Sequence, residues 1–178
     1  MEEKTMFYCT ECGTKLVPKY LEKEGMIPWC EKCRAYRFPT FNAAISTMVY
    51  SPDGQKILLI KQYGREQNIL VAGYINKGER AEHALEREVM EEMGLRVTAC
   101  TFNMSEYFEK SNTLMLNFAS IADSYDLSGM TPEVDDAAWY TPAEAREAVT
   151  NGGLAEKFLL NWLCKREFYD HMFDTCIF

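Results

Sequence analysis

The chain lacks long apolar runs, internal repeats and any excess of positive charge. Its 178 residues include 19 lysines and arginines against 27 aspartates and glutamates, a formal net charge of −8. No apolar stretch is long enough to cross a bilayer, and the opening residues MEEKTMFYC lack the basic and apolar segments of a secretory signal. We therefore expect a cytoplasmic protein without a membrane partner. The acidic balance argues against a main role in gripping long nucleic acid.

Histidine is scarce as well, and low-complexity tracts are absent. Of the two histidines, His83 falls within residues 73–95 at a position that no motif fixes, and His171 lies near the end of the chain, so we assign neither a catalytic role. Apolar residues make up 47% of the chain, which excludes general disorder and indicates a globular core. The length fits one domain of ordinary size plus a small appendage.

Cysteine, by contrast, is abundant for a chain of this kind. Four of the seven cysteines form two CxxC pairs separated by seventeen residues: Cys9, Cys12, Cys30 and Cys33. This spacing is typical of a four-thiolate structural Zn²⁺ site in a ribbon of short hairpins, where the metal supplies the folding energy. A redox pair and two disulfides remain alternatives. We place this zinc ribbon at residues 1–38, with Phe38-Pro39 as the junction.

A glutamate-rich helix is expected within residues 73–95. Apolar residues from Ala81 to Met93 recur every four positions and form one stripe. Glu88, Glu91 and Glu92 share the neighbouring face, where their like charges repel one another. A divalent cation that prefers hard oxygen ligands, Mg²⁺ or Mn²⁺, would remove this repulsion. For these glutamates alone, an ordinary charged helix facing water is the alternative.

The complete pattern of this stretch resembles the Nudix box, with every fixed position filled. It reads Gly73, five residues, Glu79, seven residues, Arg87-Glu88-Val89, one residue, Glu91-Glu92, one residue, Gly94-Leu95. The resemblance implies a loop–helix–loop that holds metal ions against a diphosphate. Glu88, Glu91, Glu92 and the Gly73 carbonyl would be the ligands, and an ion pair between Glu79 and Arg87 would fix the loop. The box alone does not identify the general base.

The resemblance also implies an α+β fold, a Nudix α/β/α sandwich with a mixed sheet, over residues 39–178. Strand-like runs fit this fold, and a turn at Ser51-Pro52-Asp53-Gly54 joins the first two. These runs are residues 41–50, 55–63, 68–75, 95–102 and 113–121. A capping box at Thr141-Pro142-Ala143-Glu144 predicts a helix that ends at 151–153, and helical spacing predicts a terminal helix over 154–173.

A four-cysteine ribbon before a Nudix domain resembles the NADH pyrophosphatase branch, the NudC-like proteins, over most of the chain. In that branch an array SQPWPFPxS follows the box at a fixed distance. Here that distance gives SEYFEKSNT, beginning at Ser105. Ser105 and the following Leu114-Met115 agree with the branch, but the glutamine, the prolines and the Trp-Phe pair are replaced. The dinucleotide specificity is therefore open.

Three further positions match the branch. Thr131-Pro132-Glu133, six residues before Trp139-Tyr140, corresponds to a segment whose glutamate is an additional metal ligand, although a surface loop would also suit Glu133. Tyr74 and Phe38 fall where the branch has aromatic residues that stack on adenine. Such stacking contributes about 1–3 kcal/mol per base. Core packing is the alternative for Phe38.

The resemblance thus implies a nucleotide substrate and hydrolysis of its diphosphate, with NADH or NAD⁺ giving AMP and nicotinamide mononucleotide. ADP-ribose, another nucleotide sugar or a (deoxy)nucleoside triphosphate are the alternative substrates. A non-catalytic module that senses a nucleotide, or binds a partner through the ribbon, is the alternative of another class. Because the branch commonly forms homodimers, we expect one here.

Overall fold

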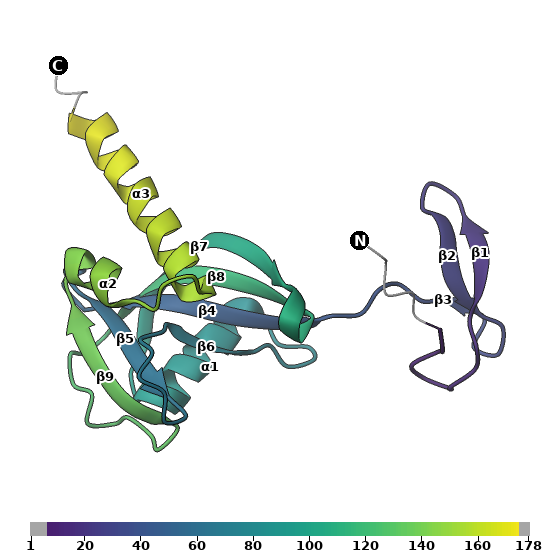
Figure 1. The fold of residues 1–178 in the computed structure, drawn as a ribbon, viewed down its shortest axis with the longest axis horizontal. Coiled ribbons are helices and arrows are strands. Elements are labelled where there is room, and N and C mark those ends of the chain that lie inside the picture. Colours follow the sequence, from purple (N-terminus) through teal and green to yellow (C-terminus); the bar gives the residue numbers. More distant parts are fainter. Residues whose placement is uncertain (1–6, 175–178) are drawn as a thin grey trace. The chain divides into compact units, whose positions relative to one another are not determined.

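The computed structural model describes residues 7–174, and the side chains up to residue 166. It divides into two compact units, Met1–Phe41 and Asn42–Phe178 (Figure 1). The strands are β1 Val17–Leu21, β2 Gly25–Cys30, β3 Ala35–Tyr36, β4 Asn42–Tyr50, β5 Ile57–Gln62, β6 Val71–Tyr74, β7 Val97–Phe108, β8 Thr113–Ala122 and β9 Val134–Tyr140. The helices are α1 Ala81–Met93, the short 3-10 turn η1 Glu109–Ser111, α2 Pro142–Ala148 and α3 Leu154–Asp174. No helix within the described residues is long and apolar enough to cross a membrane.

The N-terminal unit is a small antiparallel sheet of β1, β2 and β3 with very little apolar core. Within residues 7–41 the buried apolar side chains are Cys9, Leu16 and Cys30. Trp29 and Tyr36, paired across β2 and β3, touch edge to face with ring centroids 4.7 Å apart. So small a core cannot stabilise the unit alone, which agrees with the predicted need for a metal.

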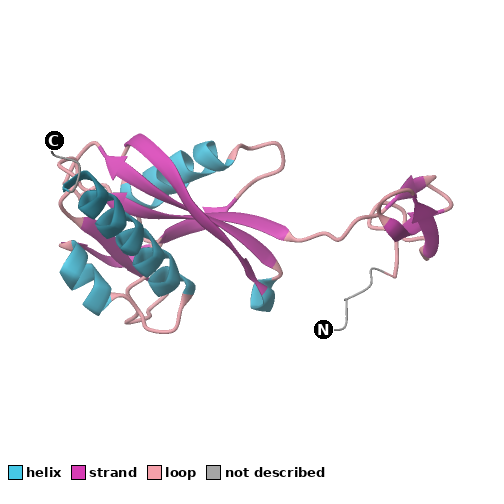
Figure 2. Ribbon diagram, turned by 90° about the horizontal axis from the view of Figure 1, so that it is seen from above, coloured by secondary structure: helices cyan, strands magenta, loops and turns pink. Residues whose placement is uncertain are grey.

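The second unit contains a six-stranded mixed sheet in the order β7-β8-β4-β5-β9, with β6 also paired to β4. The β4–β8 pair is parallel from Asn42↔Thr113 to Tyr50↔Ile121, and the other pairs are antiparallel. Alternation along β5 sends Leu58 and Ile60 toward α1, and Ile57 and Leu59 toward α2 and α3. Helices therefore cover both faces, as Figure 2 shows, and the predicted α/β/α sandwich is confirmed.

Two elements of the second unit differ from the sequence expectations. The strand expected over 95–102 continues as β7 to Phe108, so the SEYF part of the altered array is strand. Strand β9 was not predicted, because its sequence VDDAAWY is rich in aspartate and alanine, which have low strand propensity. Pairing with β5 forms β9 despite this. The predicted capping box is present, with Thr141 and Glu144 bonded reciprocally at the start of α2.

Candidate active site

Helix α1 is held against the sheet by a fully buried apolar stripe. Ala84, Leu85, Val89 and Met93 are 0% exposed and belong to the core beneath this helix. The helix ends at Gly94, whose φ of 67° is left-handed and whose N–H bonds to Met90 O. With this stripe buried, the adjoining glutamate face lies along the edge of the helix–sheet contact.

Gly73, the first residue of the box motif, brings the β6 backbone against a glutamate of α1. A Cβ at this position would overlap the Glu88 carboxyl group. Glycine therefore allows the Glu88 carboxyl group to lie directly against the β6 backbone in this arrangement. Glu88 itself is half-buried.

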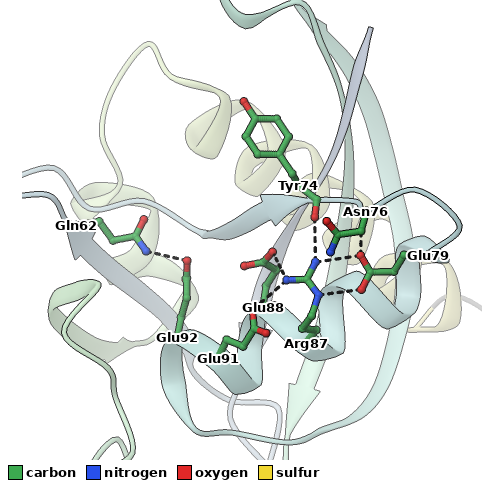
Figure 3. A network of polar contacts seen from close by, with 8 residues as sticks. All are labelled: Gln62, Tyr74, Asn76, Glu79, Arg87, Glu88, Glu91 and Glu92. Atoms are coloured by element: carbon green, nitrogen blue, oxygen red, sulfur yellow. Dashed lines mark hydrogen bonds and ion pairs between the residues drawn. The ribbon is translucent and has the colours of Figure 1, made fainter. Parts of the chain in front are cut away.

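Arg87 is the centre of the polar network in Figure 3. Its Nε and Nη2 donate to both oxygens of Glu79, at 2.8 and 3.0 Å, and Nη2 also donates to Tyr74 O at 3.0 Å. Its Nη1 donates to Glu88 Oε1 at 2.6 Å and to Glu91 Oε2 at 3.0 Å. The Arg87 bond, followed by one from the Asn76 backbone N–H, lowers the pKa of Glu79 to about 2. The guanidinium thus ties the loop before α1 to the glutamate face.

Glu92 lies deeper than the other two glutamates of the trio. It is 4% exposed, and its Oε1 accepts a bond from Gln62 Nε2 at 2.9 Å. Its other oxygen, Oε2, is buried and has no hydrogen-bond partner among the described residues. Burial raises the pKa of Glu92 to about 7; the Gln62 bond opposes this, and the charges of Glu88, Glu133 and Glu91 add to it.

The loop that carries Glu133 is attached to the C-terminal end of α1. Thr131 N donates to Glu92 O at 3.0 Å, and the backbone of Gly129 packs against Gly94 so closely that a Cβ on Gly94 would lie 2.9 Å from it. Glu133 is exposed, and its charge acts on Glu92. The Glu133 carboxylate, forty-one residues after Glu92 in the sequence, therefore lies close enough for its charge to raise the pKa of Glu92.

These groups fit a hard divalent cation by their donor set. The carboxylates and the Gly73 carbonyl are oxygen ligands, and the unpartnered buried oxygen of Glu92 is a polar atom that a cation would satisfy. In the described part of the chain, however, only the four cysteines have ligand atoms all within 4.8 Å of one another. The glutamates are less tightly gathered, because Glu88 and Glu91 bond to Arg87 and Glu92 bonds to Gln62.

The residues predicted to bind substrate do not all meet the glutamate face. The Tyr74 ring is 57% exposed and points away from the glutamates, while its carbonyl faces Arg87 (Figure 3). Ser105 is exposed on β7, opposite Leu116, on the sheet face that α1 covers. Phe38 belongs to the N-terminal unit and is 51% exposed. Their substrate-binding roles stay predictions.

Gln62 is the polar group at this site that sequence reasoning missed. A signal was present, because residues 58, 60 and 62 alternate onto one face of β5, and the third is polar where the first two are apolar. The box begins eleven residues later, at Gly73, so none of its fixed positions falls on β5 and the motif gives Gln62 no role.

The four cysteines of the N-terminal unit converge as a second potential metal site. Cys9 and Cys33 have Sγ atoms 3.9 Å apart, and those of Cys12 and Cys30 are 3.5 Å apart. A tetrahedron with Zn–S bonds of about 2.3 Å separates its sulfurs by about 3.8 Å, so the spacing fits zinc. Burial alone would raise the pKa of the Cys9 thiol, but bonds from Arg37 Nε, at 3.2 Å, and from backbone groups lower it to about 6.

Comparison with known proteins agrees with this geometry. Residues 40–162 match the NUDIX domain family, which is well over half of the chain and includes the whole box. The chain belongs to the Nudix family. Among solved structures, a NUDIX hydrolase from Nitrosomonas europaea shares this Nudix fold with a TM-score of 0.66 at 17% identity, covering 92% of this chain and 93% of that one. The NUDIX domain of Shewanella oneidensis NrtR, solved with ADP ribose, has a TM-score of 0.58 at 16% identity, covering 79% and 94%.

Curated relatives of this Nudix chain include bacterial enzymes named NAD-capped RNA hydrolase NudC. The protein from Vibrio cholerae is 28% identical over 140 residues, which cover 77% of this chain and 50% of the relative. That from Shigella flexneri is 31% identical over 136 residues, covering 75% and 51%. Nudix hydrolase 19 of Arabidopsis thaliana is 28% identical over 151 residues, covering 80% and 34%. The chain spans about half the length of the NudC relatives, and these matches support the NudC-like branch.

Proposed function

We propose that this Nudix chain is a metal-dependent pyrophosphohydrolase that cleaves the diphosphate of NADH or NAD⁺ to AMP and nicotinamide mononucleotide. The observation that carries the proposal is the buried, unpartnered oxygen of Glu92 on the face that also presents Glu88 and Glu91. The names of the NudC relatives support a dinucleotide substrate, because an NAD cap contains the same diphosphate bond. The net charge of −8 favours a small nucleotide over long RNA.

The carboxylates of the glutamate face would have two roles: to bind cations and to transfer a proton. Glu88, Glu91, Glu92, Glu133 and the Gly73 carbonyl would hold Mg²⁺ or Mn²⁺. A cation held there would supply neutralisation of the phosphoryl oxygens and activation of the attacking water. One carboxylate would accept the proton of that water. Arg87, bonded to Glu79 and to Tyr74 O, keeps the loop and α1 in register around these groups.

For the N-terminal unit we propose a structural Zn²⁺ on Cys9, Cys12, Cys30 and Cys33. The sulfur spacing and the small apolar core support this assignment. We also propose that the chain acts as a homodimer in the cytoplasm, as the branch resemblance implies. Multi-angle light scattering of the purified chain measures the assembly directly, and a monomer mass would contradict it.

The test of substrate is chromatographic product analysis on NADH, NAD⁺, ADP-ribose, nucleotide sugars and deoxynucleoside triphosphates, each with Mg²⁺ and with Mn²⁺. AMP and the reduced mononucleotide as dominant products support the proposal. Preference for ADP-ribose or a triphosphate means that the segment SEYFEKSNT has redirected the pocket. No metal-dependent turnover of any substrate would leave the nucleotide-sensing module as the better account.

The test of mechanism is Glu92→Gln, which removes the buried carboxylate and retains its size. We expect turnover to fall by at least about 10²-fold with the fold intact, because an amide replaces neither an anionic cation ligand nor a proton acceptor. Glu86→Gln is the matched control, because Glu86 is an exposed glutamate of α1 outside the box positions. Near-normal activity of the Glu92 variant contradicts the proposed mechanism.

A further inference from the structure

Gln62 is a polar side chain in the apolar layer beneath α1. It ends β5, where the preceding residues on the same face, Leu58 and Ile60, are 0% exposed. Gln62 itself is 7% exposed. Burying an amide in this layer costs free energy unless it is hydrogen-bonded, so its bond to Glu92 decides whether the side chain is tolerated there.

The contact between Gln62 and Glu92 distinguishes the two oxygens of the carboxylate. Gln62 Nε2 donates to Oε1 at 2.9 Å, whereas Oε2 has no partner among the described residues. An amide N–H can only donate, so the bond requires an oxygen with a free lone pair. A rotation of the carboxylate that takes both oxygens away from Nε2 leaves a buried donor unsatisfied, which costs about 1–3 kcal/mol.

A β-bulge lies opposite Gln62 on the neighbouring strand, β9. The pairing of β5 with β9 shifts register between Lys61 and Gln62: Lys61 faces Asp136 and Gln62 faces Val134, leaving Asp135 as the extra residue of a bulge. Asp135 then accepts a bond from Gly64 N at 2.6 Å. Bulges re-aim side chains and are common beside active sites.

The residue after Gln62 adds a second, independent sign of constraint. Tyr63 has a φ of 60°, a left-handed conformation that an aromatic residue adopts only at a cost of about 1–2 kcal/mol. Its side chain is 74% exposed, so no buried contact of the ring offsets this cost. Strain of this kind persists where the surrounding structure fixes a functional geometry. Here it lies in the turn at Tyr63-Gly64, immediately after Gln62.

We propose that Gln62 is a positioning residue that holds Glu92 by Oε1 and so presents Oε2 to the divalent cation. The inference rests on the proposed function in that it takes Glu92 to be a cation ligand. In this proposal, a residue outside the Nudix box contributes to the affinity of the site for the cation. Partners that orient a ligand in this way typically change metal affinity or activity by about 10–100-fold when they are removed.

The experiment compares three substitutions of Gln62 in the full chain. Gln62→Met keeps the length and apolar stem and removes the donor; Gln62→Glu keeps the shape and replaces the donor by an acceptor. Gln62→His keeps an N–H at the same reach. Gln55→Met is the matched control, because Gln55 is an exposed glutamine of the turn before β5. The readouts are Mn²⁺ affinity, from the electron paramagnetic resonance signal of free Mn²⁺, together with kcat, KM and the unfolding temperature.

We expect Mn²⁺ affinity to fall about 10-fold or more in the Met and Glu variants, with kcat falling in parallel and KM for NADH little changed. The His variant and the control remain near wild type. A loss in all three Gln62 variants that follows their unfolding temperatures would mean a purely structural role and overturn the proposal. So would wild-type Mn²⁺ affinity in the Met and Glu variants.

These outcomes are separable from those of the proposed function. An active wild-type enzyme whose Met and Glu variants bind Mn²⁺ normally overturns the positioning role alone. A wild-type chain that hydrolyses no substrate, but whose Met and Glu variants lose Mn²⁺ affinity, retains the positioning role and overturns the proposed activity.

Discussion

Glu88, Glu91 and Glu92 occupy one face of α1 in three different environments. Glu91 is exposed, Glu88 is half-buried against Gly73, and Glu92 is buried with its pKa raised to about 7. Three residues that look equivalent in the motif therefore differ in solvation and in hydrogen-bond partners. The identity of the general base follows from such differences rather than from the motif.

Asp53, in the turn between β4 and β5, gives a prediction about acid stability. Bonds from the Ser51 hydroxyl, the Tyr125 hydroxyl and the Gln55 N–H lower the pKa of Asp53 from 3.8 to about 2. Because the folded-state pKa is below the unfolded one, the ionised carboxylate stabilises the fold above about pH 4. This contribution is lost as the pH falls toward 2. Asp53→Asn should lower the urea midpoint at pH 6 and differ progressively less from wild type toward pH 3.

The urea series needs only the two proteins at several pH values, with circular dichroism as the probe. A midpoint difference that stays constant from pH 6 to pH 3 would show that the aspartate contributes by packing or shape, not by charge. A difference that grows as the pH falls would contradict the sign of the pKa shift.

At the scale of elements, the contact between α1 and the loop before β9 decides where Glu133 lies. Its two anchors are Thr131 N on Glu92 O, at 3.0 Å, and the close approach of Gly129 to Gly94. A Cβ on Gly129 would lie 3.1 Å from Gly94 Cα, so the loop would have to move by a few tenths of an ångström. Overpacking of this kind costs about 1–3 kcal/mol.

Gly129→Ala should therefore destabilise the fold by about 1–2 kcal/mol in chemical denaturation and weaken Mn²⁺ binding, because Glu133 moves with the loop. Gly153→Ala is the control, since a Cβ there would meet Thr150 O at an ordinary 3.6 Å. Its effect should stay within about 0.5 kcal/mol. Unchanged Mn²⁺ affinity in a destabilised Gly129 variant would separate Glu133 from the metal site.

The segment SEYFEKSNT, which replaces the array of the NudC-like branch, forms the hairpin end of β7 and β8. Ser105 to Phe108 complete β7, η1 forms the turn, and Thr113 opens β8. On the α3 face, Glu106 pairs with Lys157 at 2.6 Å, which ties the hairpin to α3. The sequence comparison identified the substituted positions, but the strand pairing assigned alternate residues to opposite faces of the sheet. We therefore predict that any contact of this segment with substrate depends on the pairing of the hairpin as well as on its individual residues.

At the scale of the whole molecule, the two units differ in what stabilises them. The second unit buries two apolar layers, one on each face of its sheet. The N-terminal unit buries Cys9, Leu16 and Cys30, with Cys12 and Cys33 packed against them. A structural Zn²⁺ contributes about 10–16 kcal/mol of apparent binding free energy in small units of this type.

We therefore predict one Zn²⁺ per chain by elemental analysis of the purified protein. Chelation, or Cys12→Ser, should remove amide exchange protection from the strands of residues 7–41 and retain it in 42–166. Cys164→Ser is the control, because Cys164 is an exposed thiol of α3. Protection of β1 and β2 that survives loss of the metal would contradict a structural role for zinc.

The sequence by itself determined the features that depend on short spacing. The glutamate face of α1, its apolar stripe, the cap of α2 and each of the two CxxC motifs depend on short spacings, where helical period and turn chemistry act. The family followed from the same local pattern. These features could be stated before any contact was known, because local geometry alone relates their residues.

Only the tertiary structure decided how distant segments complete the candidate site. Gln62 meets Glu92 across thirty residues, Gly129 meets Gly94 across thirty-five, and β9 forms in a sequence of low strand propensity because β5 pairs with it. These long-range contacts depend on strand register, on the bulge at Asp135 and on the close approach of glycine backbones. Such terms depend on the packing of the whole sheet against α1, so no local pattern could supply them.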